Sequence, residues 1–279
     1  MKKILVPVDF SETSILAIKI AIKIANSLNS NVQLLHIKTS NKYMPDFAKD
    51  NIESVLAANA NQNLTKIMEE HKDSYLVENG VFDVKIREGN VVREIRNQAH
   101  YNDSDLIVVG THGMSGFEDR WLGSNAYRLI SNAPCPVLAV RQNMQFDKAG
   151  KLLLPIQVEK VSRRIVPQVV SFAKMLNLDI VVCGITPKKR WKVPGRVNSY
   201  VSQVEKYIKK HSDLKAEYYM KDGLENPIEL MELAHSKEVG IVALAVKKGI
   251  NPFESIFNPF TNELLNISDL PIFAVPEKQ

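Results

Sequence analysis

The stretch Lys3–Ile37, KILVPVDFSETSILAIKIAIKIANSLNSNVQLLHI, contains the pattern that decides the fold. It begins with a short apolar run, KILVPV, and ends with another, VQLLHI, and runs of this length are typical of buried strands. Between them, apolar residues recur at helical spacing, and Ser11 is the expected N-cap of that helix. The stretch therefore predicts a strand, a crossover helix and a second, parallel strand.

The same pattern occurs twice in the chain. Lys3–Ile37 aligns without a gap to Lys151–Ile185, KLLLPIQVEKVSRRIVPQVVSFAKMLNLDIVVCGI. Near the ends of the two halves, APCPVLAVR (Ala133–Arg141) corresponds to SDLPIFAVP (Ser268–Pro276). We infer two copies of one unit of about 140 residues each.

The repeat divides the 279 residues into two expected domains, 1–143 and 150–279, joined by a polar linker near Gln142–Gly150. Apolar residues make up 45% and charged residues 24% of the chain, as in soluble globular proteins. No apolar run approaches the roughly 20 residues that span a bilayer, and the N-terminal apolar run is too short for a signal peptide. We expect a cytoplasmic protein with no membrane partner.

The rest of the first copy continues the alternation of helices and strands, except for residues 39–50, which show no clear period. With right-handed crossovers, a strand order of 3-2-1-4-5 gives each copy a doubly wound α/β fold, a five-stranded parallel sheet with helices on both faces. The remaining predicted elements are helices over 52–71, 91–102 and 124–133, and strands over 81–87, 105–110 and 136–141.

Glycines gather directly after the fourth predicted strand. The stretch Gly110–Ile130, GTHGMSGFEDRWLGSNAYRLI, contains four of the twelve glycines of the chain. Glycine lets a backbone approach a phosphate closely, and successive main-chain N–H groups bind anions. Gly123 and Ser124 open the next helix, whose N-terminus also favours an anion.

In the predicted strand order the first and fourth strands are neighbours, so this loop lies beside the loop that follows the first strand. The strand order reverses between these two strands, and ligands bind at such a point. Asp9 in that loop suits ribose hydroxyls or a base amine. Each residue also has a structural alternative: Asp9 or Ser124 could only cap a helix, and Gly110 could only end a strand. His112 could bind a metal or shuttle protons, and Arg120 could neutralise a phosphate, or both could be ordinary loop residues.

Several function classes lack their signature. The chain has no G-x-x-x-x-G-K-[ST] motif, no G-x-G-x-x-G after the first strand and no G-x-S-x-G elbow.

Cys135 and Cys183 are expected to be reduced and structural. The net charge of +5 arises in residues 147–279, since residues 1–146 carry 16 basic and 16 acidic residues. Much of it lies in Pro187–Arg196, where a solvated loop is favoured over nucleic-acid binding.

ILVPVDFSE, DLIVVGTHGMSG and APCPVLAVR together resemble sequences of the universal stress protein family. The nucleotide motif of that family is G-2x-G-9x-G-[ST], and Gly110, Gly113, Gly123 and Ser124 stand at those spacings. The resemblance covers the first half and, through the repeat, the second half more faintly. The chain is therefore similar to a tandem member of the family.

The resemblance implies the strand order 3-2-1-4-5 and binding of ATP or another adenine nucleotide. Mg²⁺ is a further candidate cofactor, since it could assist hydrolysis. The resemblance also implies that Pro7, Val8 and Asp9 lie near adenine and ribose, and that Ile37 lines the adenine pocket. Some nucleotide-binding members carry an extra hydroxyl at the residues after Ser124, where this chain has Asn125 and Ala126. The remaining cofactor-binding residues are Gly110, His112, Gly113, Gly123, Ser124 and Asn125.

The second copy departs from this motif. Gln157 replaces Asp9, and a proline at the first position of the last helix removes an N–H donor. We therefore expect the nucleotide in the first domain only. Ala245, Lys248, Asn258 and Pro259 align with Gly110, Gly113, Gly123 and Ser124.

Three functions remain open from the sequence: a nucleotide-binding stress-response module with an unknown protein partner, a slow ATP hydrolase, and a ligand-free scaffold. Binding is favoured over turnover because hydrolysis needs a positioned water and charge neutralisation, and no general base is evident. Family members pair through their fifth strands. Here PVLAV (136–140) and PIFAV (271–275) would pair within one chain as a pseudo-dimer, with a homodimer as the alternative.

Overall fold

The computed structural model describes ten ranges of the chain, with the backbone alone for 46–58, 124, 161, 193–194, 221–222 and 259. These ranges are 1–39, 46–111, 124–142, 144, 146, 150–159, 161–186, 193–222, 226–247 and 259–277. Over them, no helix has both the length and the apolar composition that a membrane span requires.

The first repeat consists of β1 (Lys3–Pro7), α1 (Glu12–Leu28), β2 (Asn31–Lys38), α2 (Asp46–Lys72), β3 (Phe82–Glu88), α3 (Val91–Tyr101), β4 (Leu106–Gly110), α4 (Ser124–Asn132) and β5 (Val137–Val140). The second consists of β6 (Lys151–Ile156), α5 (Val161–Arg164), α6 (Val166–Met175), β7 (Asp179–Thr186), α7 (Val193–His211), β8 (Ala216–Asp222), α8 (Pro227–Ser236), β9 (Ile241–Val246), α9 (Pro259–Ile267) and β10 (Ile272–Pro276).

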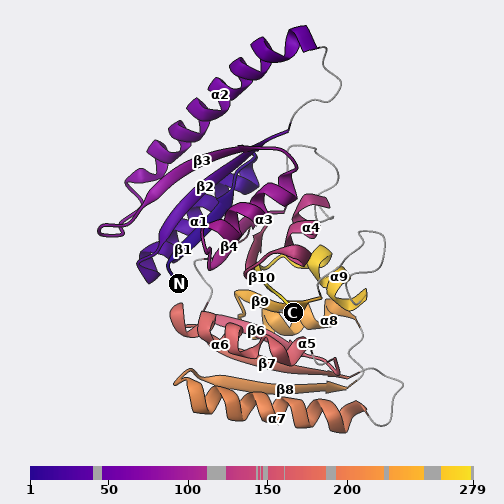
Figure 1. Cartoon of the computed structure of the whole chain (residues 1–279). Helices are drawn as coiled ribbons and strands as arrows, with labels where there is room; N and C mark the ends of the chain where they lie inside the picture. The colour runs from indigo at the N-terminus through magenta and orange to yellow at the C-terminus, as the bar shows by residue number, and fades with distance from the viewer. Residues whose placement is uncertain are drawn as a thin grey trace.

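The predicted elements of the first repeat are present, and Ser11 is confirmed as the N-cap of α1, where its hydroxyl accepts from the Ser14 N–H at 3.3 Å. The main difference is α2, which begins at Asp46 rather than at residue 52. Figure 1 shows this helix reaching past the end of the sheet. The first residues of α2 fall within residues 39–50, where the sequence shows no clear helical period, so its start could not be predicted.

The ten strands form one continuous sheet in the order β3-β2-β1-β4-β5-β10-β9-β6-β7-β8 (Figure 1). Each repeat therefore has the predicted order 3-2-1-4-5 with parallel neighbours. The two repeats meet at β5 and β10, which pair antiparallel, as the sequence predicted for PVLAV and PIFAV.

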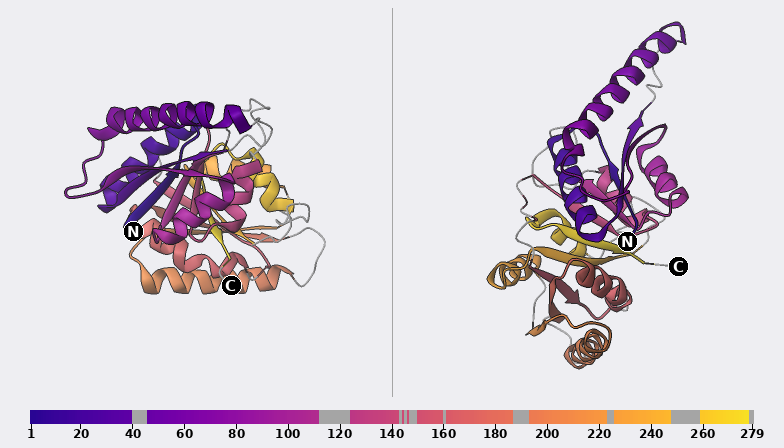
Figure 2. Two further views of the ribbon diagram at one scale, coloured as in Figure 1. Left: turned by 45° about the horizontal axis from the view of Figure 1, so that its top comes forward. Right: turned by 90° about the vertical axis from the view of Figure 1, so that its left-hand side faces the viewer.

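Helices cover both faces of the sheet (Figure 2). Buried residues of α1, α2, α6 and α7 form one apolar cluster with the sheet, and those of α3, α4, α8 and α9 form another. Both clusters contain residues of both repeats, so no gap in the packing separates the halves. The domain limits at 143 and 150 stay a prediction.

The junction has the register of a two-fold axis. Leu138 pairs with Phe273, and these two residues occupy equivalent positions in the aligned repeats. On the helices above them, the Tyr127 hydroxyl donates to Asn262 Oδ1 at 3.0 Å, and these are again equivalent positions. The Arg141 guanidinium donates to main-chain carbonyls at the end of α9, and burial lowers its pKa.

The first helix of the unit differs between the repeats. It is unbroken in α1 but divided into α5 and α6 in the second repeat, with Pro167 at the start of α6. Proline lacks the N–H that would continue the helical ladder and its ring clashes with the preceding turn. The division of this helix therefore follows from one residue.

Candidate functional site

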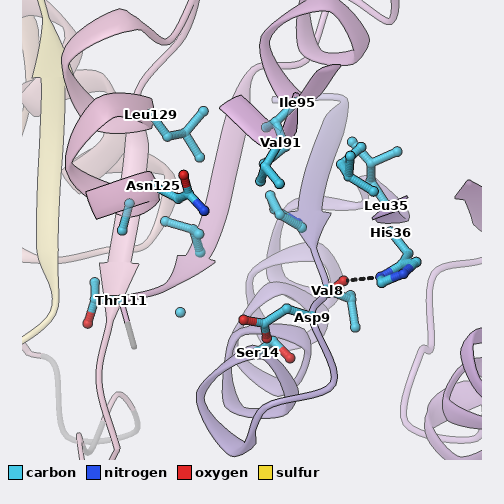
Figure 3. Close-up of a pocket in the computed structure, with 15 residues that line it drawn as sticks. Val8, Asp9, Ser14, Leu35, His36, Val91, Ile95, Thr111, Asn125 and Leu129 are labelled. Atoms are coloured by element: carbon cyan, nitrogen blue, oxygen red, sulfur yellow. Dashed lines mark hydrogen bonds between the residues drawn. The ribbon is translucent and has the colours of Figure 1, made fainter. Parts of the chain in front are cut away.

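The carboxyl ends of β1 and β4 lie side by side at the edge of the sheet, where the strand order reverses. They border a cavity of about 220 Å³, whose lining residues are drawn in Figure 3. Open parallel sheets bind their ligands at this position. The predicted site residues that line the cavity are Pro7, Val8, Asp9, Ile37, Gly110 and Asn125.

The other predicted residues of the glycine loop are not tested. His112, Gly113 and Gly123 lie outside the described residues, as does Arg120. Ser124 is the first residue of α4, but its side chain is not among those described. The roles assigned to these residues from the sequence stay predictions.

Asp9 combines a structural role with an exposed position. Its Oδ1 accepts hydrogen bonds from the Ser11 N–H at 3.1 Å and the Ser11 hydroxyl at 2.5 Å. Asp9 is therefore not the cap itself but orients the residue that caps α1. In Figure 3 its carboxylate points from the end of β1 toward the side of the cavity where Thr111 and Asn125 lie.

Phe10, the next residue, has a left-handed backbone with φ 67°. This conformation is rare for a bulky side chain. The ring of Phe10 lies against that of His36, with centroids 4.6 Å apart, and His36 Nδ1 lies 2.8 Å from the Val8 carbonyl oxygen. One residue of β2, His36, thus contacts both Val8 and Phe10 and holds an unusual turn in place.

Gly110 is needed for packing. A Cβ at this position would lie 2.7 Å from the Thr13 carbonyl carbon and 2.8 Å from the Thr13 carbonyl oxygen. Real Cβ atoms do not approach other atoms so closely, so only glycine lets the end of β4 reach the first turn of α1. The close approach brings the end of β4 and the start of α1 together beside the cavity.

Apolar side chains from two helices form the far wall. Val91 and Ile95 are one turn apart on α3, and Leu129 is one turn beyond Asn125 on α4. Their spacing in the sequence is that of any core-facing helix, so it could not mark them as cavity residues. The lining residues that the sequence analysis missed are Ser14, Leu35, His36, Val91, Ile95, Val109, Thr111, Ala126 and Leu129.

The family model that matches this chain is that of the universal stress protein family, over residues 1–141. The chain belongs to this family. Universal stress protein MJ0531 of Methanocaldococcus jannaschii is 33% identical over 143 residues, which are 50% of this chain and 82% of that protein. Universal stress protein YxiE of Bacillus subtilis is 28% identical over 149 residues, 50% of this chain and 98% of that protein.

The second repeat is also found in a solved relative. The crystal structure of a universal stress protein from Archaeoglobus fulgidus matches 98% of this chain and 98% of its own, with a TM-score of 0.76 and 13% identity. This likeness extends the universal stress protein fold over both repeats, and at that identity it shows the fold alone.

The universal stress protein fold of the second repeat has different side chains at the cavity positions. Phe260 stands where the first repeat has Asn125, and Val246 where it has Thr111. These residues are 8% and 0% exposed. In the second repeat, larger or wholly apolar side chains thus line the position that is equivalent to the cavity of the first repeat.

Two further features of this universal stress protein concern metals and thiols. Within the described part of the chain, no group of three His, Cys, Asp or Glu residues could hold a metal ion. Cys135 and Cys183, the two cysteines of the chain, are buried and form no disulfide. Burial, with a smaller effect of Asp105, raises the pKa of the Cys135 thiol to about 12.

Proposed function

We propose that the first repeat binds an adenine nucleotide and that the second repeat serves as its structural partner. The protein would act as a binding module of the stress response. One universal stress protein has been solved in complex with cAMP. The proposal for this chain depends on its own cavity, in which a carboxylate and a helix N-terminus border an apolar space.

The division of the cavity into polar and apolar parts supports this ligand class. Ile37, Val91 and Leu129 offer apolar contacts suited to the faces of a base. Asp9, at the opposite side, is a hydrogen-bond acceptor suited to ribose hydroxyls. The N-terminus of α4 adds main-chain N–H groups and the positive end of a helix dipole, which favour phosphate.

The size of the cavity indicates which part of a nucleotide it would hold. Its volume of about 220 Å³ is below the roughly 300–1,000 Å³ typical of pockets for whole drug-sized ligands. We propose that base and sugar enter the cavity and that the phosphates lie beyond it, at α4 and the motif glycines. Mg²⁺ would then be bound mainly through the phosphate oxygens.

Binding is proposed rather than turnover. Asp9 is the only carboxylate among the described lining residues, and its Oδ1 already accepts two hydrogen bonds from Ser11. A carboxylate that already accepts two hydrogen bonds at the end of β1 is better suited to bind a sugar hydroxyl than to activate a water for attack on phosphorus. Single-turnover hydrolysis of ATP should therefore be negligible, whereas a measurable rate that Asp9→Ala abolishes would make the protein an ATP hydrolase.

The direct experiment is to denature the purified protein and identify any released nucleotide by mass spectrometry. In parallel, thermal unfolding is measured with ATP, AMP and cAMP, because a ligand that binds only the folded state raises its stability. Asp9→Ala should weaken the affinity by about tenfold, since it removes a charged acceptor to which the ribose hydroxyls would donate.

The matched control is Gln157→Ala, which changes the equivalent residue of the second repeat and should leave the affinity unchanged. If no nucleotide is released and none of the three raises the unfolding temperature, the proposal is wrong. An equal loss of affinity in the two variants would contradict the assignment to the first repeat.

A further inference from the structure

We infer that His36 is a positioning residue for the proposed nucleotide site, acting through Asp9 from the opposite face of the sheet. The inference rests on the proposed function and extends it to a residue that the family's nucleotide motif does not contain. His36 holds the turn between β1 and α1 through a hydrogen bond and a ring contact.

His36 borders the cavity, but its ring points toward the other face of the sheet. Its neighbours on β2, Leu35 and Ile37, face the apolar cluster on the cavity side, and side chains alternate along a strand. Phe10, which the ring contacts, packs against the cluster on the other side. Figure 3 accordingly shows the ring across Val8 from the cavity, so direct contact of the imidazole with a ligand is not required.

His36 fixes the residue that precedes Asp9. The Val8 N–H donates to the Leu35 carbonyl at 2.8 Å, as in a continuing parallel ladder. The Val8 carbonyl is 2.8 Å from His36 Nδ1, and because a carbonyl can only accept, Nδ1 must carry the proton. A side chain of β2 thus donates a hydrogen bond to a main-chain carbonyl at the point where β1 ends.

His36 also fixes the residue that follows Asp9. The positive φ of Phe10 is costly for a side chain with a Cβ, and such conformations persist only when their surroundings hold them. The ring of His36, inclined by 41° to that of Phe10, supplies a contact that favours this backbone conformation. Asp9 therefore lies between two residues that are both held by one imidazole, and its carboxylate is directed into the cavity before a ligand arrives.

The second repeat shows the same unit without this arrangement. Where the first repeat has Asp9, Phe10 and His36, the second has Gln157, Val158 and Gly184. The space next to Gly184 is taken by Met220 and Val197, and Val158 is not among the described residues with positive φ. The carboxylate, the strained turn and the imidazole are thus all missing from the same copy.

Positioning should appear as affinity because a preorganised carboxylate does not have to be ordered during binding. His36→Ala should weaken the binding of a fluorescent ATP analogue by about five- to tenfold, as expected for loss of one hydrogen bond and a ring contact. His36→Asn keeps an N–H donor near the position of Nδ1, so it should recover most of the affinity. In the absence of nucleotide, amide hydrogen exchange over residues 8–11 should be faster in His36→Ala than in wild type.

A matched control is available in the second repeat. His211 Nδ1 lies 2.9 Å from the Tyr207 carbonyl, and its ring stacks on that of Tyr207 at 4.1 Å. His211→Ala therefore removes the same two kinds of contact at the end of α7. It should leave nucleotide affinity unchanged.

A double-mutant cycle tests whether His36 acts through Asp9. In an Asp9→Ala background, adding His36→Ala should change the dissociation constant by less than twofold, because nothing remains to be positioned. Additive losses, or wild-type affinity in His36→Ala, would overturn the inference while leaving the nucleotide proposal intact. Failure of the wild-type protein to bind any nucleotide would instead refute the proposed function, and the inference with it.

Discussion

Replacing Gly110 with alanine should destabilise the protein even in the absence of a ligand. The new Cβ would lie 2.7 Å from the Thr13 carbonyl carbon and 2.8 Å from both Thr13 oxygens. Two of these three atoms belong to the backbone of the first turn of α1 and cannot rotate away. The end of β4 and the start of α1 must therefore move apart.

The cost can be estimated from two opposing effects. Overpacking of a well-packed interior costs about 1–3 kcal/mol, and a clash with backbone belongs in the upper part of that range. Against this, alanine reduces the conformational entropy of the unfolded chain, which stabilises by about 0.4–1 kcal/mol. The net loss should be about 2 kcal/mol, which corresponds to about 4–8 °C in the unfolding temperature if the protein unfolds in one transition.

The assay is urea unfolding of the nucleotide-free protein, followed by far-ultraviolet circular dichroism. Gly150→Ala is the matched control, because a Cβ there meets nothing within 4 Å, and it should be neutral or slightly stabilising. If Gly110→Ala and Gly150→Ala unfold at the same urea concentration, Gly110 is not a packing glycine. Its presence would then have to be explained by the ligand alone.

Further predictions concern the junction and the thiols. Tyr127→Phe, which removes the hydrogen bond to Asn262, should lower the free energy of unfolding by about 1 kcal/mol in a urea titration. Arg141→Met should cost about 1–3 kcal/mol, because it leaves the carbonyls at the end of α9 without their donor. Since the pKa of Cys135 is raised from 9.0 to about 12, iodoacetamide at pH 8 should not modify it in the folded protein, as read by mass spectrometry. The buried thiol stabilises the fold fully below pH 9, and this contribution should be lost as the pH rises toward 12. Residues 1–143 expressed alone should self-associate in analytical ultracentrifugation, because β5 would present an open edge; a monodisperse monomer would count against this.

The sequence was informative where one local pattern determines one element. The strands of the first repeat were predicted within one or two residues, because short apolar runs between polar turns have few other interpretations. The pairing of the two fifth strands was also predicted. Its register, with Leu138 opposite Phe273, could not be, since it depends on how the two repeats dock.

The site was harder to predict because its residues look ordinary. Val91 and Leu129 are apolar positions of amphipathic helices, and only the tertiary structure shows that they border a cavity. Nothing in a phenylalanine suggests the positive φ of Phe10, which arises from contacts with a strand some 25 residues away. Gly110 was singled out for approach to a phosphate, whereas the structure shows a second reason, its contact with Thr13.

Tyr127 and Asn262 occupy the same place in their repeats and meet each other at the junction. In an assembly of two separate, identical subunits, each residue on the symmetry axis faces a copy of itself, so a donor there must find its acceptor in the same side-chain type. Fusion of the two units removes that restriction. One gene can then evolve a hydrogen-bonded pair of unlike residues. One repeat can keep a specialised site while the sequence of the other repeat diverges, and dilution cannot change their one-to-one ratio.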